Sequence, residues 1–224
     1  PGTTWNQRAR ADKPDWMSPR MAWRAIQSAL PKNAIISSDI GNNCAIGNAY
    51  PSFDEGRKYL APGLFGPCGY GLPSIVGAKI GQPDVPVVGF AGDGAFGIAV
   101  NELTAIGRDE WPAVTQIVFR NYQWGAEKRN STLWFDDNFV GTELDTKVSY
   151  AGIAQACGLQ GVQVKTMDEL TAVLDQAIKD QMHNNKTTLI EVILNQELGE
   201  PFRRDAMKKP VQVAGVAAAD MAAE

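Results

Sequence analysis

The chain has 224 residues, of which 44% are hydrophobic and 21% charged, a composition typical of one globular domain with a substantial core. This composition excludes disordered and collagen-like chains. Its 21 Lys and Arg residues against 25 Asp and Glu residues give a net charge of −4 without a basic stripe, so we expect no nucleic-acid partner. No uncharged apolar run approaches the roughly 20 residues that cross a bilayer, and the N-terminus is polar. We therefore expect no membrane partner and a cytoplasmic protein.

Cysteine and histidine are too few for several kinds of site. Cys44, Cys68 and Cys157 contain no C-x-x-C pair, so they predict neither a disulfide framework nor a zinc site and fit a reducing compartment. The single histidine, His183, leaves little material for Ser-His-Asp or multi-histidine metal chemistry. We expect it at an exposed helix end.

Apolar runs and helix-length segments alternate along the chain. We expect helices over 19–30, 72–80, 99–108, 148–157 and 167–182, and strands over 34–38, 85–90, 113–119, 161–164 and 188–194. The last helix carries a capping box, Thr166 with Glu169, and apolar residues at helical spacing. Several strands are apolar almost throughout, as strands covered on both faces are. The pattern predicts an α/β fold with a doubly wound, mostly parallel sheet and helices on both faces.

The ends of the chain differ from its middle. Residues 1–18 hold several prolines and do not begin with Met, so we expect a linker that continues from a longer protein. Residues 19–200 are expected to form one domain. Residues 201–224, which end in an alanine-rich stretch, are expected to form a C-terminal lid or tail.

Ligands of such sheets bind outside the carboxyl ends of the strands, where four segments of this chain are chemically unusual. These are 37–43 (SSDIGNN), the glycine-rich 63–71 (GLFGPCGYG), 92–95 (GDGA) and 121–125 (NYQWG). Asp93 lies between two glycines at the start of a helix, where free N–H groups bind anions. A carboxylate beside an anion site would repel phosphate, so we expect a divalent cation to bridge Asp93 to phosphate oxygens.

Magnesium fits this site because it prefers oxygen ligands in octahedral geometry. Asn121 follows the next strand, where its amide oxygen would lie beside Asp93, and the carbonyl of Gln123 would add a third ligand. Gly-Asp-Gly alone is more often a simple turn, and the spaced asparagine strengthens the prediction. No G-x-G-x-x-G after a strand is followed by an acidic residue about 20 positions on, which disfavours a nicotinamide site, and the absence of G-x-x-x-x-G-K-[ST] disfavours a P-loop site.

The Gly-Asp-Gly turn and the spaced asparagine resemble the diphosphate-binding module of thiamine diphosphate enzymes. Segments 66–73 (GPCGYGLP), 92–114 and above all 120–144 (RNYQWGAEKRNSTLWFDDNFVGTEL) resemble the sulfoacetaldehyde acetyltransferase family, relatives of acetolactate synthase. The similarity extends from about Pro14 to Arg204.

The resemblance implies that Asp93, Asn121 and the Gln123 carbonyl bind Mg²⁺. It implies that thiamine diphosphate contacts Gly41, Asn42, Asn43, Cys68, Gly69, Gly92, Asp93, Gly94, Ala95, Asn121, Gln123, Trp124 and Gly125. The sequence departs from the family pattern at Arg120, where superfamily members usually carry another asparagine. Arg120 is then either a substrate-anion contact or a surface charge.

The family's reaction would convert sulfoacetaldehyde and phosphate into acetyl phosphate and sulfite. It also needs a glutamate from the pyrimidine-binding domain of a neighbouring subunit, and no segment here resembles that domain. The resemblance therefore implies a homo-oligomeric full-length protein, of which this chain is the C-terminal module and inactive alone.

Two substrate anions require cations near the cofactor. Our candidates are Lys128 and Arg129, besides Arg120, with Arg203 and Arg204 as a lid. Glu127 is a candidate ion-pair partner of Lys128. Trp124 and Trp134 would either form a pocket wall or pack in the core.

Two other functions stay open. One keeps the cofactor but decarboxylates and joins 2-oxoacids, as acetolactate synthase does. The other is a non-catalytic scaffold domain that binds no cofactor.

Overall fold

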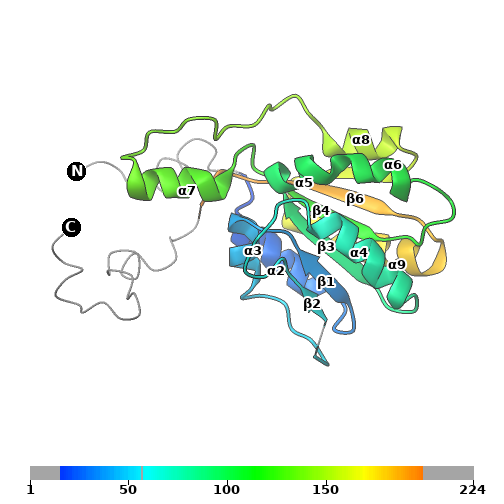
Figure 1. Ribbon diagram of the computed structural model, residues 1–224. Helices are drawn as coiled ribbons and strands as arrows, with labels where there is room; N and C mark the ends of the chain where they lie inside the picture. The colour runs from blue at the N-terminus through cyan, green and yellow to red at the C-terminus, as the bar shows by residue number, and fades with distance from the viewer. Residues whose placement is uncertain (1–15, 57, 199–224) are drawn as a thin grey trace.

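The computed structural model describes residues 16–56 and 58–198, which form a six-stranded sheet with helices on both faces (Figure 1). The elements are α2 (Pro19–Ala29), β1 (Ile35–Ser38), α3 (Asn42–Gly47), β2 (Tyr59–Leu60), α4 (Gly71–Gly81), β3 (Val87–Gly92), α5 (Asp93–Ala99), the 3₁₀ turn η1 (Val100–Glu102), α6 (Leu103–Ile106), β4 (Thr115–Arg120), α7 (Gly125–Trp134), α8 (Tyr150–Ala156), β5 (Gln160–Val164), α9 (Met167–His183) and β6 (Thr188–Ile193).

All strand pairs in the sheet are parallel, in the order β2-β1-β3-β4-β6-β5. The chain runs from β1 to β2 on one side and then continues from β3 on the other side of β1. The strand order therefore reverses between β1 and β3, which is where open α/β sheets bind their ligands. The predicted doubly wound parallel sheet is confirmed.

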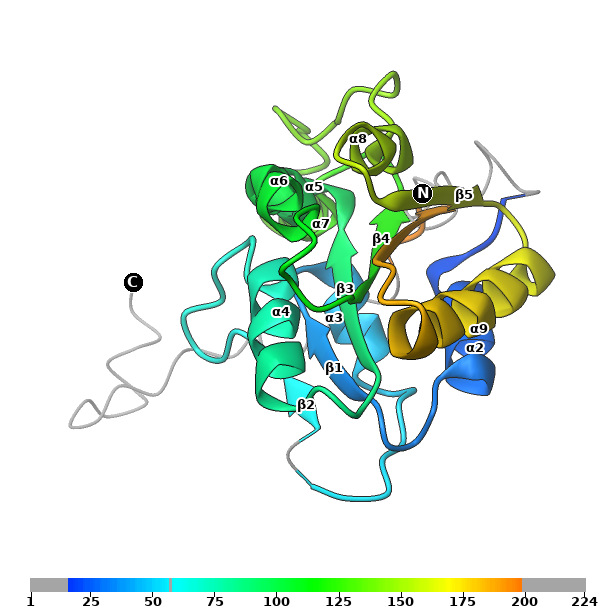
Figure 2. The ribbon, with the colours of Figure 1, turned by 90° about the vertical axis from the view of Figure 1, so that its right-hand side faces the viewer.

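Each face of the sheet is covered by its own helices (Figure 2). One apolar layer joins α2 and α9 to the strand residues whose side chains point to that face, such as Phe90 and Phe119. The other layer joins α4, α5, α6 and α8 to the alternate strand residues, such as Val87 and Val118. Burial on both faces explains why these strands are apolar almost throughout.

Most of the predicted elements are present, with ends shifted by a few residues. The helix expected over 99–108 is instead a succession of α5, η1 and α6 that begins at Asp93. His183 is the last residue of α9 and is exposed, as predicted. We predicted neither β2 nor α3, which are short, nor α7, which lacks a regular apolar stripe and lies beyond the carboxyl ends of the strands (Figure 1).

No helix in the described ranges is both long and apolar enough to span a bilayer. The predicted C-terminal segment 201–224, with Arg203 and Arg204, lies outside the described residues, as does most of the predicted linker.

Candidate functional site

A pocket of about 140 Å³ lies where β1, β3 and β4 end. Of the residues predicted to bind the cofactor, the pocket is lined by Gly41, Asn42, Cys68, Gly92, Asp93, Gly94, Ala95, Asn121, Gln123, Trp124 and Gly125. Gly69 is not part of the lining, and the side chain of Asn43 is not described. The pocket also contains residues that we did not predict, namely Ile40, Gly66, Ala126 and Glu127.

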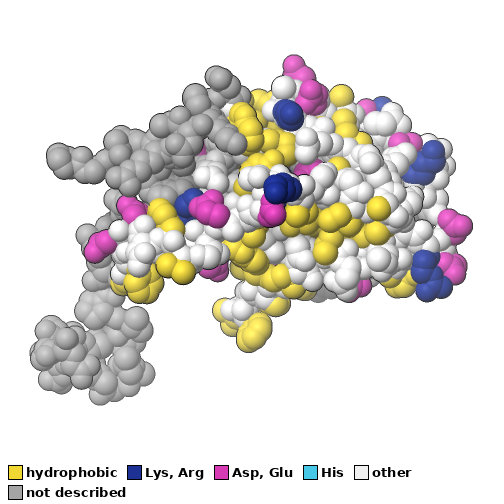
Figure 3. All heavy atoms as spheres, turned by 90° about the horizontal axis from the view of Figure 1, so that it is seen from above, with side chains coloured by type: hydrophobic (Ala, Val, Ile, Leu, Met, Phe, Trp, Pro, Cys, Tyr) yellow, Lys and Arg dark blue, Asp and Glu magenta, His cyan; other side chains and the backbone are white. Residues whose placement is uncertain are grey.

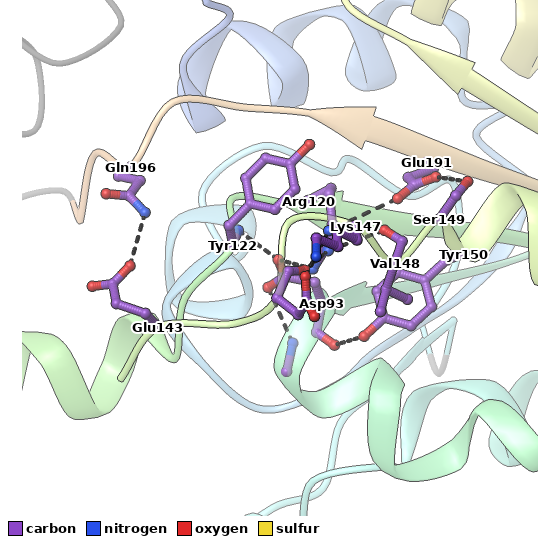
Figure 4. A network of polar contacts seen from close by, with 12 residues as sticks. Asp93, Arg120, Tyr122, Glu143, Lys147, Val148, Ser149, Tyr150, Glu191 and Gln196 are labelled. Carbon is purple, nitrogen blue, oxygen red and sulfur yellow. Dashed lines mark hydrogen bonds and ion pairs between the residues drawn. The ribbon is translucent and has the colours of Figure 1, made fainter. Parts of the chain in front are cut away.

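Asp93 is the first residue of α5 and lines the pocket. Hydrogen bonds fix the orientation of its carboxylate (Figure 4). Its Oδ1 accepts the Gly94 N–H at 3.0 Å, and its Oδ2 accepts the Tyr122 N–H at 2.6 Å and Nη1 of Arg120 at 3.1 Å. Burial raises the pKa of Asp93 to about 6, against the opposing effects of Arg120 and the backbone donors. The carboxylate is therefore an oriented but poorly solvated anion.

Asn121 and Gln123 follow β4 and are both buried at the pocket. Nε2 of Gln123 donates to the carbonyl of Gln196 at 3.0 Å, whereas its buried Oε1 has no hydrogen-bond partner in the described part of the chain. The backbone of residues 121–125, here called the metal loop after the predicted Mg²⁺ ligands Asn121 and Gln123, is held by residues 142–144. The Trp124 N–H donates to the Thr142 carbonyl at 2.8 Å within this pairing.

The donors around the pocket suit a hard cation. They are one carboxylate, one amide and the oxygens of Gln123, the oxygen chemistry that Mg²⁺ prefers. In residues 16–56 and 58–198, no three His, Cys, Asp or Glu side chains come together as a metal cluster. A magnesium ion at this position would thus need oxygens from a bound ligand as well.

Gly94 brings the backbone close to the pocket wall formed by Trp124. A Cβ atom at Gly94 would lie 2.7 Å from the Trp124 ring, so only glycine leaves that ring where it is. Trp124 therefore forms a pocket wall, whereas Trp134 is 57% exposed and belongs to neither the pocket nor the core.

Asp39 organises the glycine-rich segment 63–71, a role that the sequence analysis missed although it identified the segment 37–43 that contains Asp39. Its Oδ1 accepts the Ile40 and Gly69 N–H groups at 2.8 and 3.1 Å, and its Oδ2 accepts the Gly71 N–H at 2.8 Å. Burial raises the pKa of Asp39, and these backbone donors oppose the shift. The signal was present as a carboxylate directly after β1, but the glycines that it holds are about thirty residues away in sequence.

Cys68 lines the pocket from the same segment as a free thiol. Burial and the nearby charges of Asp39 and Glu127 raise its pKa, so the side chain is a neutral thiol at ordinary pH.

Of the candidate anion-binding residues, the three that the structure describes, Arg120, Lys128 and Arg129, do not line the pocket itself. Arg129 reaches it indirectly, because its Nη1 donates to Oδ1 of Asn42 at 3.1 Å. Lys128 is buried and forms an ion pair with Glu143. The prediction that Glu127 is its partner was therefore wrong.

Arg120 is not a surface charge. It is 1% exposed and lies beside Asp93, outside the pocket lining, because its position on β4 points its side chain into the layer under α8. The same position does not support a direct contact with a substrate anion in the pocket.

Comparison with known proteins places the chain in a family. The model described as "Thiamine pyrophosphate enzyme, C-terminal TPP binding domain" matches residues 39–192. A sulfoacetaldehyde acetyltransferase of Roseovarius nubinhibens is 84% identical over 99% of this chain and 36% of that protein. One of Rhodobacter capsulatus is 78% identical over 99% of this chain and 37% of that protein. The chain thus spans little more than a third of these curated relatives.

A solved structure has the same fold. The thiamine diphosphate-dependent 4-hydroxybenzoylformate decarboxylase of Rhodococcus jostii RHA1 matches with a TM-score of 0.73 at 24% identity, over 81% of this chain and 33% of that chain. The sheet, the pocket at its switch point and the match over 39–192 agree. The chain belongs to the thiamine pyrophosphate enzyme family and carries its C-terminal TPP-binding domain.

Proposed function

We propose that this chain is the cofactor-binding part of a sulfoacetaldehyde acetyltransferase that uses thiamine diphosphate and Mg²⁺. The full reaction would convert sulfoacetaldehyde and phosphate into acetyl phosphate and sulfite. The observation that carries the proposal is the 84% identity, over 99% of this chain, to a protein named for that activity. The pocket supports it, because most of the residues that the family resemblance assigned to the cofactor line one cavity.

In this proposal the chain binds the charged end of the cofactor. Asp93, Asn121 and the Gln123 carbonyl hold Mg²⁺, and the ion neutralises the diphosphate that would otherwise face a carboxylate. The N–H groups at the start of α5 and Gly125 of the metal loop orient the diphosphate. Cys68 contacts the aminopyrimidine through its backbone. Two features fit a bound magnesium diphosphate group. The buried Oε1 of Gln123 has no hydrogen-bond partner among the described residues, and Gly94 exposes its backbone to the pocket because it has no side chain.

Bound thiamine diphosphate supplies the carbon nucleophile and the electron sink that the reaction needs. The chain's own contribution is to orient that group and to place a cation near the substrate anions. Of the three candidates that the structure describes, Arg129 is best placed for sulfonate or phosphate, because it contacts a residue of the pocket lining. Lys128 and Arg120 are already occupied by carboxylates.

The rest of the cofactor would be covered by the pyrimidine-binding domain of a neighbouring subunit in a homo-oligomer. The pocket of about 140 Å³ is smaller than the ~300 Å³ or more of a complete small-molecule site. Beside it, Leu64 and Phe65 are 108% and 92% exposed, and further apolar side chains gather on the face seen from above (Figure 3). Exposed apolar surface of this kind fits coverage by another domain. We expect no turnover from the isolated chain.

The proposed metal site is tested by calorimetric titration of thiamine diphosphate into the chain with and without Mg²⁺. Asp93→Asn and Asn121→Ala should each weaken the Mg²⁺-dependent affinity by about 10–100-fold, because the first removes the negative charge of a ligand and the second removes an oxygen ligand. Asp175→Asn, an exposed aspartate of α9, is the matched control and should bind as the parent chain does. Parental affinity in Asp93→Asn would place the metal elsewhere.

The proposed reaction is tested on the full-length protein. Acetyl phosphate should form from sulfoacetaldehyde and phosphate and not from pyruvate alone. Acetolactate from pyruvate, without release of sulfite from sulfoacetaldehyde, would favour the 2-oxoacid alternative. A folded protein that takes up no cofactor would favour the scaffold alternative.

A further inference from the structure

Arg120 lies between two carboxylates in the interior of the protein (Figure 4). Its Nη1 is 3.1 Å from Oδ2 of Asp93, and its Nε is 3.6 Å from Oε1 of Glu191. All three side chains are 1% exposed. A buried charge costs several kcal/mol unless it is paired, so an arginine at this position needs a structural or functional reason.

The remaining edges of the guanidinium are also occupied. Its Nη2 donates to the carbonyls of Asp145 and Val148, the latter at 3.1 Å. Its Cζ lies 4.3 Å from the ring centre of Tyr122 and 5.2 Å from that of Tyr150. The Nε edge faces Glu191 as an ion pair without a hydrogen bond among the described residues. A planar guanidinium can face all of these partners at once, whereas an ammonium group reaches only some of them.

One consequence concerns the orientation of Asp93. Among the described residues, Arg120 and the Tyr122 N–H both bind Oδ2, whereas Oδ1 receives the Gly94 N–H alone. A carboxylate oxygen accepts more than one partner, so Oδ1 keeps capacity for a cation. The arginine thus fixes the carboxylate without occupying the oxygen that a metal would use.

A second consequence concerns the metal loop. Tyr122 has a φ of 61°, a left-handed conformation that is unfavourable for a non-glycine residue. Its ring stacks on Arg120, its N–H donates to Asp93, and its carbonyl accepts the Leu144 N–H at 2.9 Å. These contacts hold the turn that determines where the next residue, Gln123, presents its oxygens.

Glu191 keeps the charge of the cluster suitable for a cation. Asp93 and Arg120 alone would form a neutral pair, whereas the second carboxylate leaves one net negative charge. Oε2 of Glu191 is bound by Oγ of Ser149 at 3.0 Å and by the Ala151 N–H at 3.2 Å. The arginine can therefore act as a brace without cancelling the attraction for a divalent ion.

We propose that Arg120 is a positioning residue for the metal site, which orients Asp93 directly and Gln123 through the left-handed Tyr122. The proposal rests on the proposed function, because it needs a cation held by Asp93 and the metal loop. Arg120 itself touches neither the metal nor the substrate.

The test measures binding of Mn²⁺, as a probe for Mg²⁺, to the 224-residue chain with thiamine diphosphate present. Electron paramagnetic resonance gives the dissociation constant, the number of sites and the line shape of bound Mn²⁺. Arg120→Lys should weaken Mn²⁺ binding about 10-fold or more and change the line shape, while circular dichroism shows a folded chain. A merely structural role would lower the number of sites without changing the affinity of those that remain.

A second pair of variants keeps the test decisive should Arg120→Lys unfold. Tyr122→Gly accepts the left-handed turn without strain but loses the ring, so its Mn²⁺ affinity should fall while the ion pairs stay intact. Tyr122→Phe keeps the ring and should restore binding. Arg108→Lys, at an exposed arginine paired with Glu110, is the control and should bind as the parent does.

The outcomes separate this inference from the proposed function. Loss of Mn²⁺ binding in Asp93→Asn, together with parental affinity and line shape in Arg120→Lys or in Tyr122→Gly, would overturn the inference and leave the metal site standing. Parental binding in Asp93→Asn would overturn both.

Discussion

Two regions at strands β3 and β4 are equally buried, but burial affects the stability of the protein differently in each. On one face, Trp23 of α2 packs against Phe90 of β3 and Phe119 of β4, with ring centres 4.7 and 5.3 Å away. At the ends of these strands, Asp93 and Arg120 form the buried polar cluster with Glu191. Both regions contain side chains that are 1% exposed. Burial stabilises the first region and costs stability in the second.

The physical reason lies in the solvation of the groups. Removing apolar area from water contributes roughly 25 cal/mol per Å², and close packing of aromatic rings adds to it. A buried ion pair at best recovers what its charges lose in hydration, and an apolar replacement of the pair is often as stable. The apolar layer therefore determines stability, and the polar cluster is best explained by the site above it.

The largest effect on stability should come from Trp23→Ala. The substitution leaves a cavity against Phe90 and Phe119, and unfolding free energy should fall by about 3–5 kcal/mol. Urea denaturation followed by circular dichroism measures the loss. Met21→Ala, on the exposed side of the same helix, should change it by no more than about 0.5 kcal/mol. A fall below about 1 kcal/mol in Trp23→Ala would contradict the division between the two regions.

Gly94→Ala should show the opposite balance, with a moderate loss of stability and a large loss of binding. The added methyl group meets the Trp124 ring at 2.7 Å and must displace this pocket wall. We expect Mg²⁺-dependent thiamine diphosphate affinity to fall at least about 10-fold and unfolding free energy by about 1–3 kcal/mol. Calorimetric titration and urea denaturation measure the two quantities.

Gly77→Ala is the control for Gly94→Ala, because a methyl group there meets nothing within 4 Å on the exposed side of α4. It should raise stability by roughly 0.5–1 kcal/mol and leave binding unchanged. Unchanged cofactor affinity in Gly94→Ala would mean that the Trp124 wall does not contact the cofactor.

The smallest effect should come from the N-terminus of α9, which lies outside both regions. Thr166 and Glu169 form a reciprocal capping box, so Thr166→Ala should cost about 1 kcal/mol, and Thr166→Ser should keep most of the cap. The Lys165 N–H, together with Thr166, lowers the pKa of Glu169 below its ordinary 4.5.

The sign of the resulting pH dependence follows from that lowered pKa. The folded state favours the ionised form of Glu169, so its contribution to stability is present above about pH 4.5 and is lost as pH falls through the lowered pKa. Thermal unfolding of the parent and of Glu169→Gln, followed between pH 3 and pH 7, measures it. A difference that does not shrink toward low pH would contradict the assignment.

Local patterns were sufficient for part of the fold. The capping box and the apolar spacing of α9 are contained within about twenty residues, and each central strand reads as an apolar run because both of its faces are covered. The same patterns failed for α7, whose sequence GAEKRNSTLW has no regular apolar stripe and which lies beyond the sheet.

The sequence predicted most of the residues that line the pocket, but not the residues that bind the side chains and backbone around it. Asp93, Asn121 and Gln123 were identified because strand ends of a parallel sheet meet at one edge. The sequence did not indicate that Glu143 binds Lys128 or that Asp39 holds Gly69 and Gly71. A further signal was present in the strand TLIEVI, where Glu191 interrupts an apolar run and requires a buried cation.

The sequence by itself determined that the sheet is parallel and doubly wound, which strand ends line the pocket, and which family the motifs resemble. Those properties depend on local periodicity and on residues whose chemistry is informative alone. Only the tertiary structure decided that Arg120 faces Asp93 and Glu191 rather than solvent. That arrangement requires Arg120 at the end of β4, Asp93 at the start of α5, Glu191 within β6 and carbonyls of the segment before α8 to meet in space. Burial and pairing of this kind are properties of the folded chain.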